Sequence, residues 1–538
     1  MQVSKLPSNI LSRIHVYLRL EKLNRLSKWR NNLVYLAVCS EWRKALLPLA
    51  YQKLYVDCTY TPNYYKEENN KYSVFSNAAL FAGATRPTLL SISMVGYGQA
   101  VVFIRKLLDY LQAIKPILTT LEELRFEVNE VPNMYHRLDK ETALRSIEDI
   151  KAAAQEFAEL APNIAKFNLY PESGSGLFQI FAQETLQEHS SSISSFEGRI
   201  SVLDGIKELP ASIGVLKLTV SNNRKLQIPL IHASKLHHFA ISRITSGFDW
   251  SVLTGGESKT IDFAQLKYLY LGKCKSFFTS IDDHADGELA NIPYTVNVPK
   301  LEYLNLHLCK QGALLFSSLQ LPKVIPYCQL SLRCRPIIVL HNARLNNGFA
   351  DVVKKHLDFP KDQQFTYDEL TNNIFSVPDL ADYVTFVTSK LPSSDIEINW
   401  PQVTKLVVAG KVDPLQLVHA VSGMPRLAEL AVSKLVPVSE DGNASMAIRR
   451  ILDEMPWSEI ESINTSMRSI QLAYRGSDWS EDAAARSIVY LMLMFRSVTS
   501  IAVPEQDFEH ISKYINNLTC GSKLHAVEII KWESYEFY

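Results

Sequence analysis

The most constraining feature of this 538-residue sequence is a pair of matching segments that lie thirty-five residues apart. They are QLKYLYLGKCK at 265–275 and KLEYLNLHLCK at 300–310, and both follow the pattern L-x-x-L-x-L-x-x-C. LEELRFEVN at 121–129 follows a variant that ends in asparagine. Alternation at the fourth and sixth positions predicts a short strand with one buried face. Because a unit this small cannot bury that face alone, we expect neighbouring copies to stack.

The pattern resembles the strand and corner of a leucine-rich repeat. The chain turns a corner after the strand in such a repeat, and an Asn or Cys side chain there can bond backbone groups that have no strand partner. Cys274 and Cys309 end the two matching copies at the same position. We therefore expect both to be buried corner residues, with no redox or metal role.

Looser copies of the strand pattern recur along the chain. Many follow a turn with proline or a small residue, as in WPQVTKLVV and MPRLAELAV, and helical stretches fill intervals such as 146–160, 346–359 and 482–495. The looser copies start at Leu89, Ile164, Ile213, Leu236, Val403, Leu427, Met467, Val498 and Leu524.

Strand, turn and helix therefore alternate at irregular intervals. The sequence predicts an α/β protein, an irregular leucine-rich-repeat-like solenoid or horseshoe over 57–538, preceded by a small helical module over 1–56. In residues 310–400 the candidate strands are YCQLSLRC and RPIIVL, and the pattern does not fix the repeat register there. We expect Cys328 and Cys334 to pack in the core, and 57–76 to be a surface loop.

The composition is that of a folded globular protein, and the chain has no net charge at pH 7. Apolar residues make up 47% and charged residues 21%, and 56 Lys and Arg balance 56 Asp and Glu. A neutral chain gives no sign of a nucleic-acid or anionic-membrane partner. Charge is nevertheless uneven, since residues 1–60 hold ten Lys and Arg against three Asp and Glu. This favours either an acidic partner for that region or a solvated basic surface.

The seven cysteines form no CxxC pair, which favours a reducing compartment and a cytoplasmic or nuclear location. No leader peptide is expected, because Arg13 and His15 interrupt the first apolar stretch. The longest apolar run, SIVYLMLMF at 487–495, has nine residues, far fewer than a membrane span needs. We expect no membrane association.

The first sixty residues contain three short helical patterns. Pro7 suits the first turn of a helix whose apolar residues share one face, and Ser40 can cap a third helix that Pro48 ends. Three helices this short bury little surface, so the unit must pack against a neighbour. The apolar positions are Leu6, Ile10, Leu11, Ile14, Tyr17, Leu18, Leu33, Leu36, Val38, Trp42 and Leu54.

In this order the head of the chain resembles an F-box, with its leucine-proline start, aliphatic helix, VC..W signature and closing strand. The resemblance implies a three-helix module that binds the Skp adaptor of a cullin-based ubiquitin ligase. About ten extra residues separate Leu18 from Leu33 compared with that family. The alternative is a helical cap on the repeat array. The adaptor-binding residues implied by the resemblance are Leu6, Pro7, Ile10, Leu11, Ile14, Leu18, Val38 and Trp42.

No catalytic or cofactor constellation is found in the sequence. GGESKT at 255–260 lacks the glycine that a phosphate loop needs before its lysine, so it gives only weak support for an enzyme. We expect no enzyme activity, no cofactor and no metal. The predicted function is instead a non-catalytic substrate receptor of a Skp-cullin-F-box ubiquitin ligase. The alternative is a leucine-rich-repeat scaffold without a link to the ligase.

We place the unknown protein client on the concave sheet face. Leucines at the fourth and sixth pattern positions point inward, so the third and fifth positions face the client. Three tyrosines on neighbouring strands would form an exposed aromatic strip, unless loops or an extra helix cover it. The predicted client-binding residues are Lys217, His238, Tyr268, Tyr270, Tyr303 and Asn305.

Overall fold

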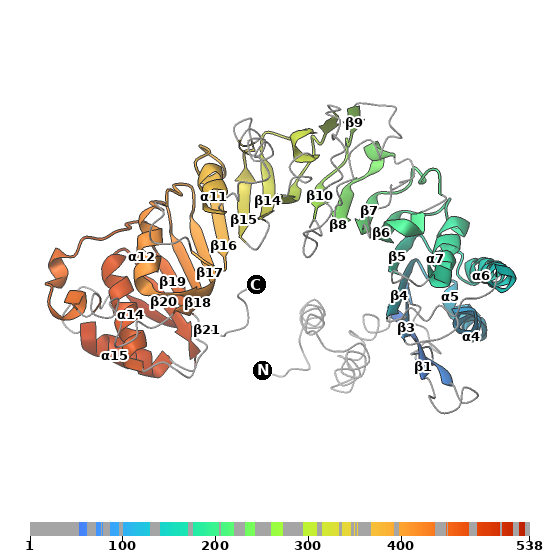
Figure 1. Cartoon of the computed structure of the whole chain (residues 1–538), viewed down its shortest axis with the longest axis horizontal. Helices are drawn as coiled ribbons and strands as arrows, with labels where there is room; N and C mark the ends of the chain where they lie inside the picture. Colours follow the sequence, from blue (N-terminus) through green and yellow to red (C-terminus); the bar gives the residue numbers. More distant parts are fainter. Residues whose placement is uncertain are drawn as a thin grey trace, which may run out of the picture. The chain divides into compact units, whose positions relative to one another are not determined.

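The computed structural model divides the chain into two compact units, Met1–Ser258 and Lys259–Tyr538. It describes residues 53–61, 71–76, 78, 87–95, 100–129, 140–170, 176–203, 206–219, 232–242, 260–272, 294–308, 315–332, 336–345, 349, 352, 367–391, 398–435, 448, 450–472, 481–505, 508–519 and 527–532. Both units combine strands and helices, so the expected α/β class is confirmed at this coarse level (Figure 1).

The first unit contains a sheet whose parallel strands follow one another in chain order. The order is β1-β3-β4-β5-β6-β7-β8, with β2 antiparallel to β1. The strands are β1 Lys53–Thr61, β2 Lys71–Ser76, β3 Leu89–Val95, β4 Glu123–Asn129, β5 Lys166–Tyr170, β6 Ser195–Arg199, β7 Val215–Thr219 and β8 His238–Ser242.

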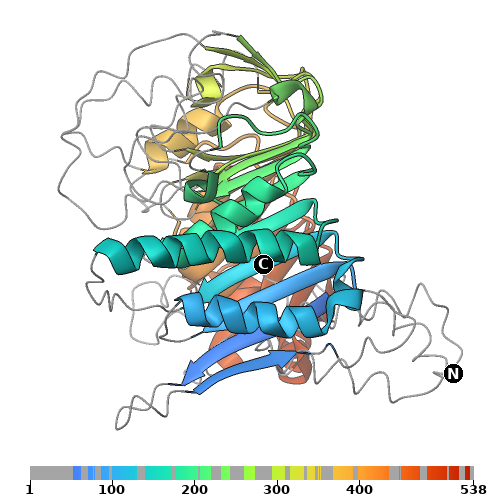
Figure 2. The same ribbon diagram turned by 90° about the vertical axis from the view of Figure 1, so that its right-hand side faces the viewer.

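Helices cover one face of this sheet, as Figure 2 shows from the side. Phenylalanines form the interface: Phe181 of a helix lies 5.7 Å from Phe126 of β4 and 6.0 Å from Phe157 of a second helix, measured between ring centroids. The other face carries no helix of the described residues. The helices are α4 Ala100–Ala113, α5 Lys115–Leu118, α6 Lys140–Leu160 and α7 Gly176–Glu188, with 3-10 turns η4 Ile200–Leu203 and η5 Ala233–Lys235.

The second unit has a larger sheet in the order β10-β12-β14-β15-β16-β17-β18-β19-β20-β21. All its neighbouring strands are parallel except that β15 runs antiparallel to both β14 and β16. The strands are β10 Tyr268–Leu271, β12 Tyr303–Leu308, β14 Ile325–Leu332, β15 Ile337–Ala343, β16 Tyr383–Thr388, β17 Lys405–Val412, β18 Glu429–Leu435, β19 Ser469–Leu472, β20 Ser500–Pro504 and β21 Glu528–Trp532.

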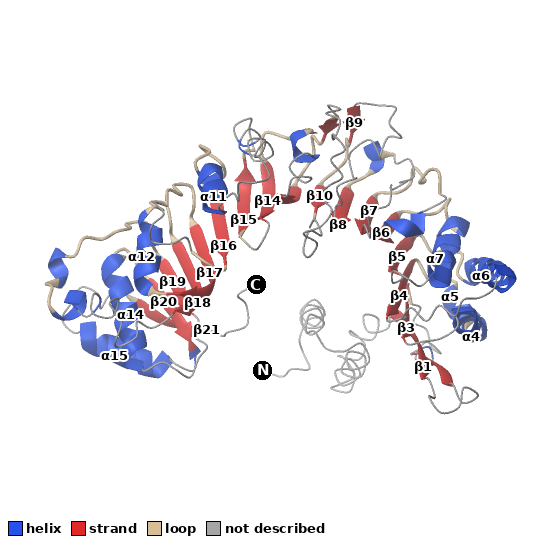
Figure 3. Cartoon of the chain, in the orientation of Figure 1, coloured by secondary structure: helices blue, strands red, loops and turns tan. Residues whose placement is uncertain are grey.

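One face of this sheet is backed first by strands and then by helices (Figure 3). A small parallel sheet in the order β13-β11-β9 backs the strands that begin the unit. Its members are β9 Thr260–Asp262, β11 Thr295–Asn297 and β13 Leu319–Gln320. The later backing elements are α11 Tyr367–Phe375, α12 Pro414–Ser422, α14 Glu481–Met494 and α15 Phe508–Thr519, with the 3-10 turn η6 Trp457–Glu459.

Burial alternates along the strands as the pattern predicts. In β10 Leu269 and Leu271 are buried, whereas Tyr268 and Tyr270 on the opposite face are partly exposed. Each of the nine looser copies leads into a strand, and YCQLSLRC and RPIIVL contribute to β14 and β15. The helical stretches 146–160 and 482–495 largely coincide with α6 and α14.

The expectation of a loop over 57–76 is wrong. Residues 57–61 belong to β1 and 71–76 to β2, and the two strands pair antiparallel with Cys58 opposite Val74. The buried alternation Leu54, Val56, Cys58 drives this pairing, because it gives the polar-looking segment one apolar face. The sheet therefore begins at Lys53, inside the expected 1–56 module.

Several predictions concern residues that the structure does not describe. They include the whole of 1–52, and Cys274, Cys309 and Cys334, whose expected packing stays a prediction. Cys328 is fully buried, as expected. Among the described helices, none has both the length and the apolar character needed to cross a membrane.

Candidate functional site

The predicted client-binding residues fall on the helix-free faces of the two sheets. Tyr268, Tyr270, Tyr303 and Asn305 lie together on β10 and β12 of the second unit, where Tyr268 is opposite Tyr303 and Tyr270 opposite Asn305. Lys217 and His238 lie on neighbouring strands of the first unit. The eight predicted adaptor-binding residues, from Leu6 to Trp42, lie outside the described residues.

The second unit extends the predicted tyrosine strip into a row of five aromatic residues on five adjacent strands. Strand register aligns Tyr268 with Tyr303, Tyr303 with Tyr327, Tyr327 with His341, and His341 with Tyr383. We call these five residues the aromatic row. All four tyrosines are partly exposed and His341 is exposed, so the row contributes to the surface of the protein.

Ring geometry divides the row into a stacked part and an edge-to-face part. The centroids of Tyr268 and Tyr303 are 4.4 Å apart with planes 9° apart, and those of Tyr303 and Tyr327 are 4.6 Å apart with planes 10° apart. His341 meets Tyr327 at 5.4 Å and 86°, and Tyr383 at 5.8 Å and 68°. Both geometries are favourable for aromatic pairs, so the rings hold one another in place.

A second row of side chains lies beside the first, one pleat further along the strands. The Tyr327 hydroxyl donates to Oε1 of Gln329 at 3.4 Å, and Gln329 lies opposite Asn305. Tyr270 lies over Gly272, where an added Cβ would come within 2.3 Å of the tyrosine ring. The glycine of the YLYLG segment is therefore what lets Tyr270 lie against its own strand.

Charged pairs flank the aromatic row. Lys405 pairs with Glu429 at 2.9 Å, and Glu429 also bonds the hydroxyl of Tyr383. Lys267 and Glu302, which precede Tyr268 and Tyr303 directly in the chain, pair at 2.8 Å. The row thus offers uncharged phenols between ion pairs that already neutralise each other.

Three phenols of the row, those of Tyr268, Tyr327 and Tyr383, resist ionisation. Burial, followed by the influence of Tyr303, raises the pKa of Tyr268 to about 12. Burial and the Glu429 carboxylate raise the pKa of Tyr383 to about 12, and burial also raises the pKa of Tyr270 and Tyr327. These hydroxyls therefore keep their protons at neutral pH and can donate hydrogen bonds.

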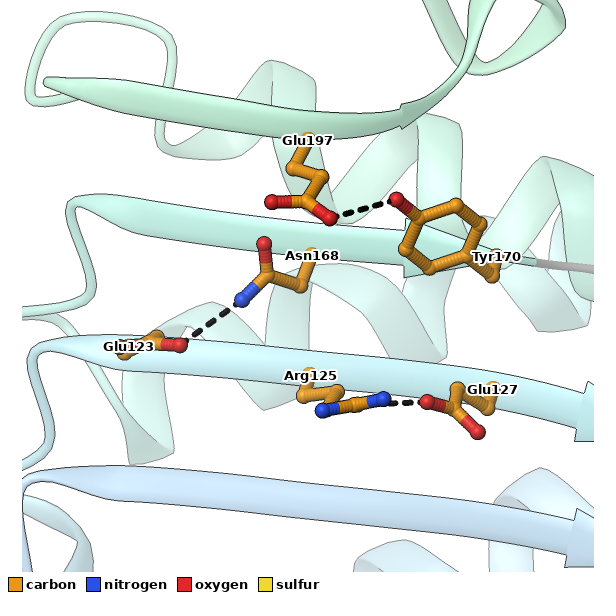
Figure 4. A network of polar contacts seen from close by, with 6 residues as sticks. All are labelled: Glu123, Arg125, Glu127, Asn168, Tyr170 and Glu197. Carbon is orange, nitrogen blue, oxygen red and sulfur yellow. Dashed lines mark hydrogen bonds and ion pairs between the residues drawn. The ribbon is translucent and has the colours of Figure 1, made fainter. Parts of the chain in front are cut away.

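The helix-free face of the first unit is polar instead of aromatic (Figure 4). Asn168 donates to Glu123 at 2.8 Å, Arg125 pairs with Glu127 at 2.5 Å, and Tyr170 donates to Glu197 at 2.8 Å. The predicted client residue Lys217 also binds Glu197, at 3.0 Å. These polar side chains pair with one another across the face. Lys217 is therefore already bound to Glu197 before any client is present.

Glu197 and His238 show the electrostatic effect of Lys217. Burial alone would raise the pKa of Glu197, but hydrogen bonds from Lys217 and Tyr170 outweigh it and hold that pKa below its usual value. Burial and then the Lys217 ammonium lower the pKa of His238 to about 4. His238 is therefore neutral at physiological pH.

Three of the five residues of the aromatic row were not found from the sequence. Tyr327, His341 and Tyr383 lie in 310–400, where the repeat pattern is interrupted. Tyr327 lies within I-x-x-C-x-L from Ile325 to Leu330, so allowing Cys328 at the fourth position would have fixed the register of β14. Tyr383 lies within A-x-x-V-x-F from Ala381 to Phe386, so allowing alanine at the first position would have revealed β16. His341 has no comparable signal, because β15 runs antiparallel to its neighbours and its residues fit no copy of the pattern.

The described residues offer little reactive chemistry. They contain no group of three His, Cys, Asp or Glu side chains placed to hold a metal ion. The two described cysteines, Cys58 and Cys328, are buried free thiols, and burial raises the pKa of both. The exposed aromatic row is suited to binding.

Comparison with known proteins leaves the family undetermined. No protein-family model matches the sequence, and a search of curated proteins finds no match to it.

Proposed function

We propose that this chain is a non-catalytic protein-binding receptor that captures a protein client on the aromatic row. The observation that carries the proposal is the alignment of Tyr268, Tyr303, Tyr327, His341 and Tyr383 across five adjacent strands. Tyrosine anchors interfaces well, because a large ring is buried at the loss of few torsions and its hydroxyl remains available for hydrogen bonding.

The proposed architecture is an irregular leucine-rich-repeat-like solenoid. Two features support it: parallel strands pair in chain order, and burial alternates at the fourth and sixth pattern positions. In such an architecture each turn adds one side chain to a row on the same face. Stacking of such turns therefore produces lateral rows of side chains such as the aromatic row.

The proposed link to a ubiquitin ligase rests on the F-box resemblance of residues 1–56. The head would bind a Skp-type adaptor and, through it, a cullin, while the aromatic row holds the client. The mechanism is proximity, since bringing client and ligase together raises their effective concentration without bond chemistry by this chain. The longer spacing between Leu18 and Leu33 favours the second candidate, a protein-binding scaffold with no ligase link.

Quantitative affinity capture from cells tests the client surface. Tyr303→Ala removes the middle ring of the three stacked tyrosines and should reduce capture of client proteins at least tenfold, as expected for an interface anchor. Tyr110→Ala, a partly exposed tyrosine on α4 of the other unit, is the matched control. Unchanged capture by a folded Tyr303→Ala protein would show that clients bind elsewhere.

The same capture experiment separates the two candidates. A ligase receptor should bring down a Skp-type adaptor and a cullin together with its clients. If the full chain, with its head intact, captures clients but no adaptor, the result supports the protein-binding scaffold with no ligase link.

A further inference from the structure

We propose that Asp382 is a positioning residue of the aromatic row, because it fixes the register of β15 and so holds His341 between two tyrosines. The inference rests on the proposed client-binding function and names a residue outside the row on which client binding depends. It follows from the direction of β15, from the backbone conformation of Asn342 and from the bonds that Asp382 makes.

His341 joins the row from a strand that runs against its neighbours. β15 is antiparallel to both β14 and β16, so the repeat pattern does not fix its register. A slip of two residues would keep the same face of β15 outward and would put Val339 where His341 now lies. Within the part of the chain that the structure describes, the imidazole makes ring contacts only, with Tyr327 and Tyr383. Its place therefore depends on the groups that fix the register of β15.

The backbone at Asn342 shifts the alternation of β15 by one residue. Asn342 has a φ of 54°, in the left-handed region, which asparagine tolerates better than most residues. Ile338 and Leu340 are buried, so simple alternation would bury position 342 next. Instead, Asn342 is exposed and Ala343 is fully buried. The seating of this end of β15 thus depends on the conformation of the residue directly after His341.

Asp382 binds both residues that flank Ala343. Its Oδ2 accepts from the side-chain amide of Asn342 at 2.9 Å, and its Oδ1 accepts from the Arg344 guanidinium at 2.5 Å. The bond from Arg344, followed by the bond from Asn342, holds the pKa of Asp382 below its usual value. The carboxylate is therefore ionised at neutral pH and uses both of its oxygens as acceptors.

The same aspartate lies beside the row on the neighbouring strand. Asp382 directly precedes Tyr383, which is opposite His341. Its backbone N–H also donates to the His341 carbonyl oxygen at 3.1 Å. Asp382 thus ties the side chains and the main chain at the end of β15 to the start of β16. It can set the position of the imidazole without a bond to the ring itself.

The exposure of this contact separates positioning from stability. The side chains of Asp382 and Arg344 are 51% and 40% exposed, and exposed ion pairs contribute little to the free energy of unfolding. Asp382→Ala should therefore leave the thermal unfolding midpoint nearly unchanged, although it releases Asn342 and Arg344 from β16.

NMR of the full chain with 13C-labelled histidine follows the position of His341 directly. Its ring lies in the ring-current fields of Tyr327 and Tyr383, and His341→Gln identifies its signal among the 13 histidines. In Asp382→Ala the signal should move towards that of an exposed histidine. Asp453→Ala, which breaks another exposed aspartate–arginine pair of the same unit, should not move it.

Client capture then tests whether Asp382 acts through His341. We expect His341→Ala to reduce capture about three- to tenfold, and Asp382→Ala by no more than that. The double variant should capture as much client as His341→Ala alone, because the two residues act as one unit. Losses that multiply in the double variant would show that Asp382 meets the client itself and would overturn the inference.

Failure of this inference can be told from failure of the proposed function. If capture depends on Tyr303 and His341 but not on Asp382, the inference is wrong and the client surface stands. If capture is independent of Tyr303, the proposed function is wrong and the His341 signal alone decides the inference. A shifted signal in Asp382→Ala then supports the positioning role, and an unchanged signal overturns it.

Discussion

The side-chain amide of Asn464 donates to the main-chain carbonyl of Met424, forty residues earlier, at 2.7 Å. Its Oδ1 accepts from the backbone N–H groups of Ser466 and Met467 at 2.7 and 2.9 Å. Asn464 is buried, and it satisfies backbone groups at the turn before β19. This is the kind of role that we expected of corner asparagines from the sequence, here at a position that the pattern did not indicate.

Asn464→Ala should therefore destabilise the second unit. It removes three hydrogen bonds and leaves buried backbone groups unpaired, which we expect to cost about 3 kcal/mol. Thermal unfolding followed by circular dichroism should show a midpoint lower by several degrees. Asn516→Ala, on an exposed position of α15, is the matched control. An equal, small effect of both substitutions would contradict this role for Asn464.

The pKa of His238 should depend on Lys217. Burial and the Lys217 charge lower it from 6.5 to about 4, so the contribution of His238 to stability is present above pH 6.5 and is lost as the pH falls towards 4. Lys217→Gln should raise the pKa of His238, because it removes a nearby cation and leaves the charge of the Glu197 carboxylate without its lysine partner. Histidine-selective NMR titration measures the shift. Lys166→Gln, an exposed lysine on the same face, should leave the pKa nearly unchanged.

Two tyrosines of the aromatic row should ionise late at alkaline pH. The pKa of Tyr268 and of Tyr383 is raised from 10.0 to about 12, so their protonated form stabilises the fold below pH 10 and that contribution is lost as the pH rises towards 12. Ultraviolet difference titration of Tyr268→Phe should lose one late-titrating phenol compared with the wild type. Loss of a phenol that ionises near pH 10 would be the contrary result.

The head of the chain should bind a Skp-type adaptor through its apolar residues. Replacing Leu6 and Pro7 together with alanine should weaken the complex by more than about tenfold, since buried anchors contribute about 1 to 3 kcal/mol each. Isothermal titration calorimetry with purified adaptor gives the affinity. Asn9→Ala, on the polar side of the same predicted helix, is the control. Unchanged binding by the folded double variant would exclude this mode of attachment.

Buried thiols should react slowly with alkylating reagents. Burial and the neighbouring Asp57 raise the pKa of Cys58 to about 12, and burial raises that of Cys328, so neither forms the reactive thiolate at neutral pH. We expect the same protection for the predicted corner residues Cys274 and Cys309. Mass spectrometry after brief native labelling identifies each modified cysteine. Rapid modification of Cys274 and Cys309 would show that they are not buried corners.

The sequence predicted strands wherever aliphatic residues occupy the key pattern positions. Elsewhere other residues stand at these positions, which left β6 and β16 without a matching pattern and β14 without a register. In β6 the sixth position is Gly198, where a Cβ would come 2.3 Å from the Leu169 carbonyl oxygen of the neighbouring strand. In β14 the fourth position is Cys328, and before β16 the first position is Ala381. Close backbone approach and small buried residues thus hid strands that an apolar pattern cannot find.

The aromatic row could be predicted only where two copies of the pattern match closely. Tyr268 and Tyr303 each begin a strand at the same pattern position, so their pairing follows from the sequence. His341 lies near the end of β15, which runs in the opposite direction. A strand reversal changes which residue of the strand joins a lateral row, and only the register of the sheet shows it.

The backing of the second unit has a mechanical consequence. The small sheet places strands behind β10, β12 and β14, and strands lie about 4.8 Å apart in both layers, whereas packed helices need 8 to 10 Å. Equal spacing front and back keeps these turns parallel, in agreement with the flat stacking of Tyr268, Tyr303 and Tyr327. The turns that contain β10, β12 and β14 should therefore be the stiffer part of the unit. Bending of the unit under load should occur in the helix-backed turns that follow.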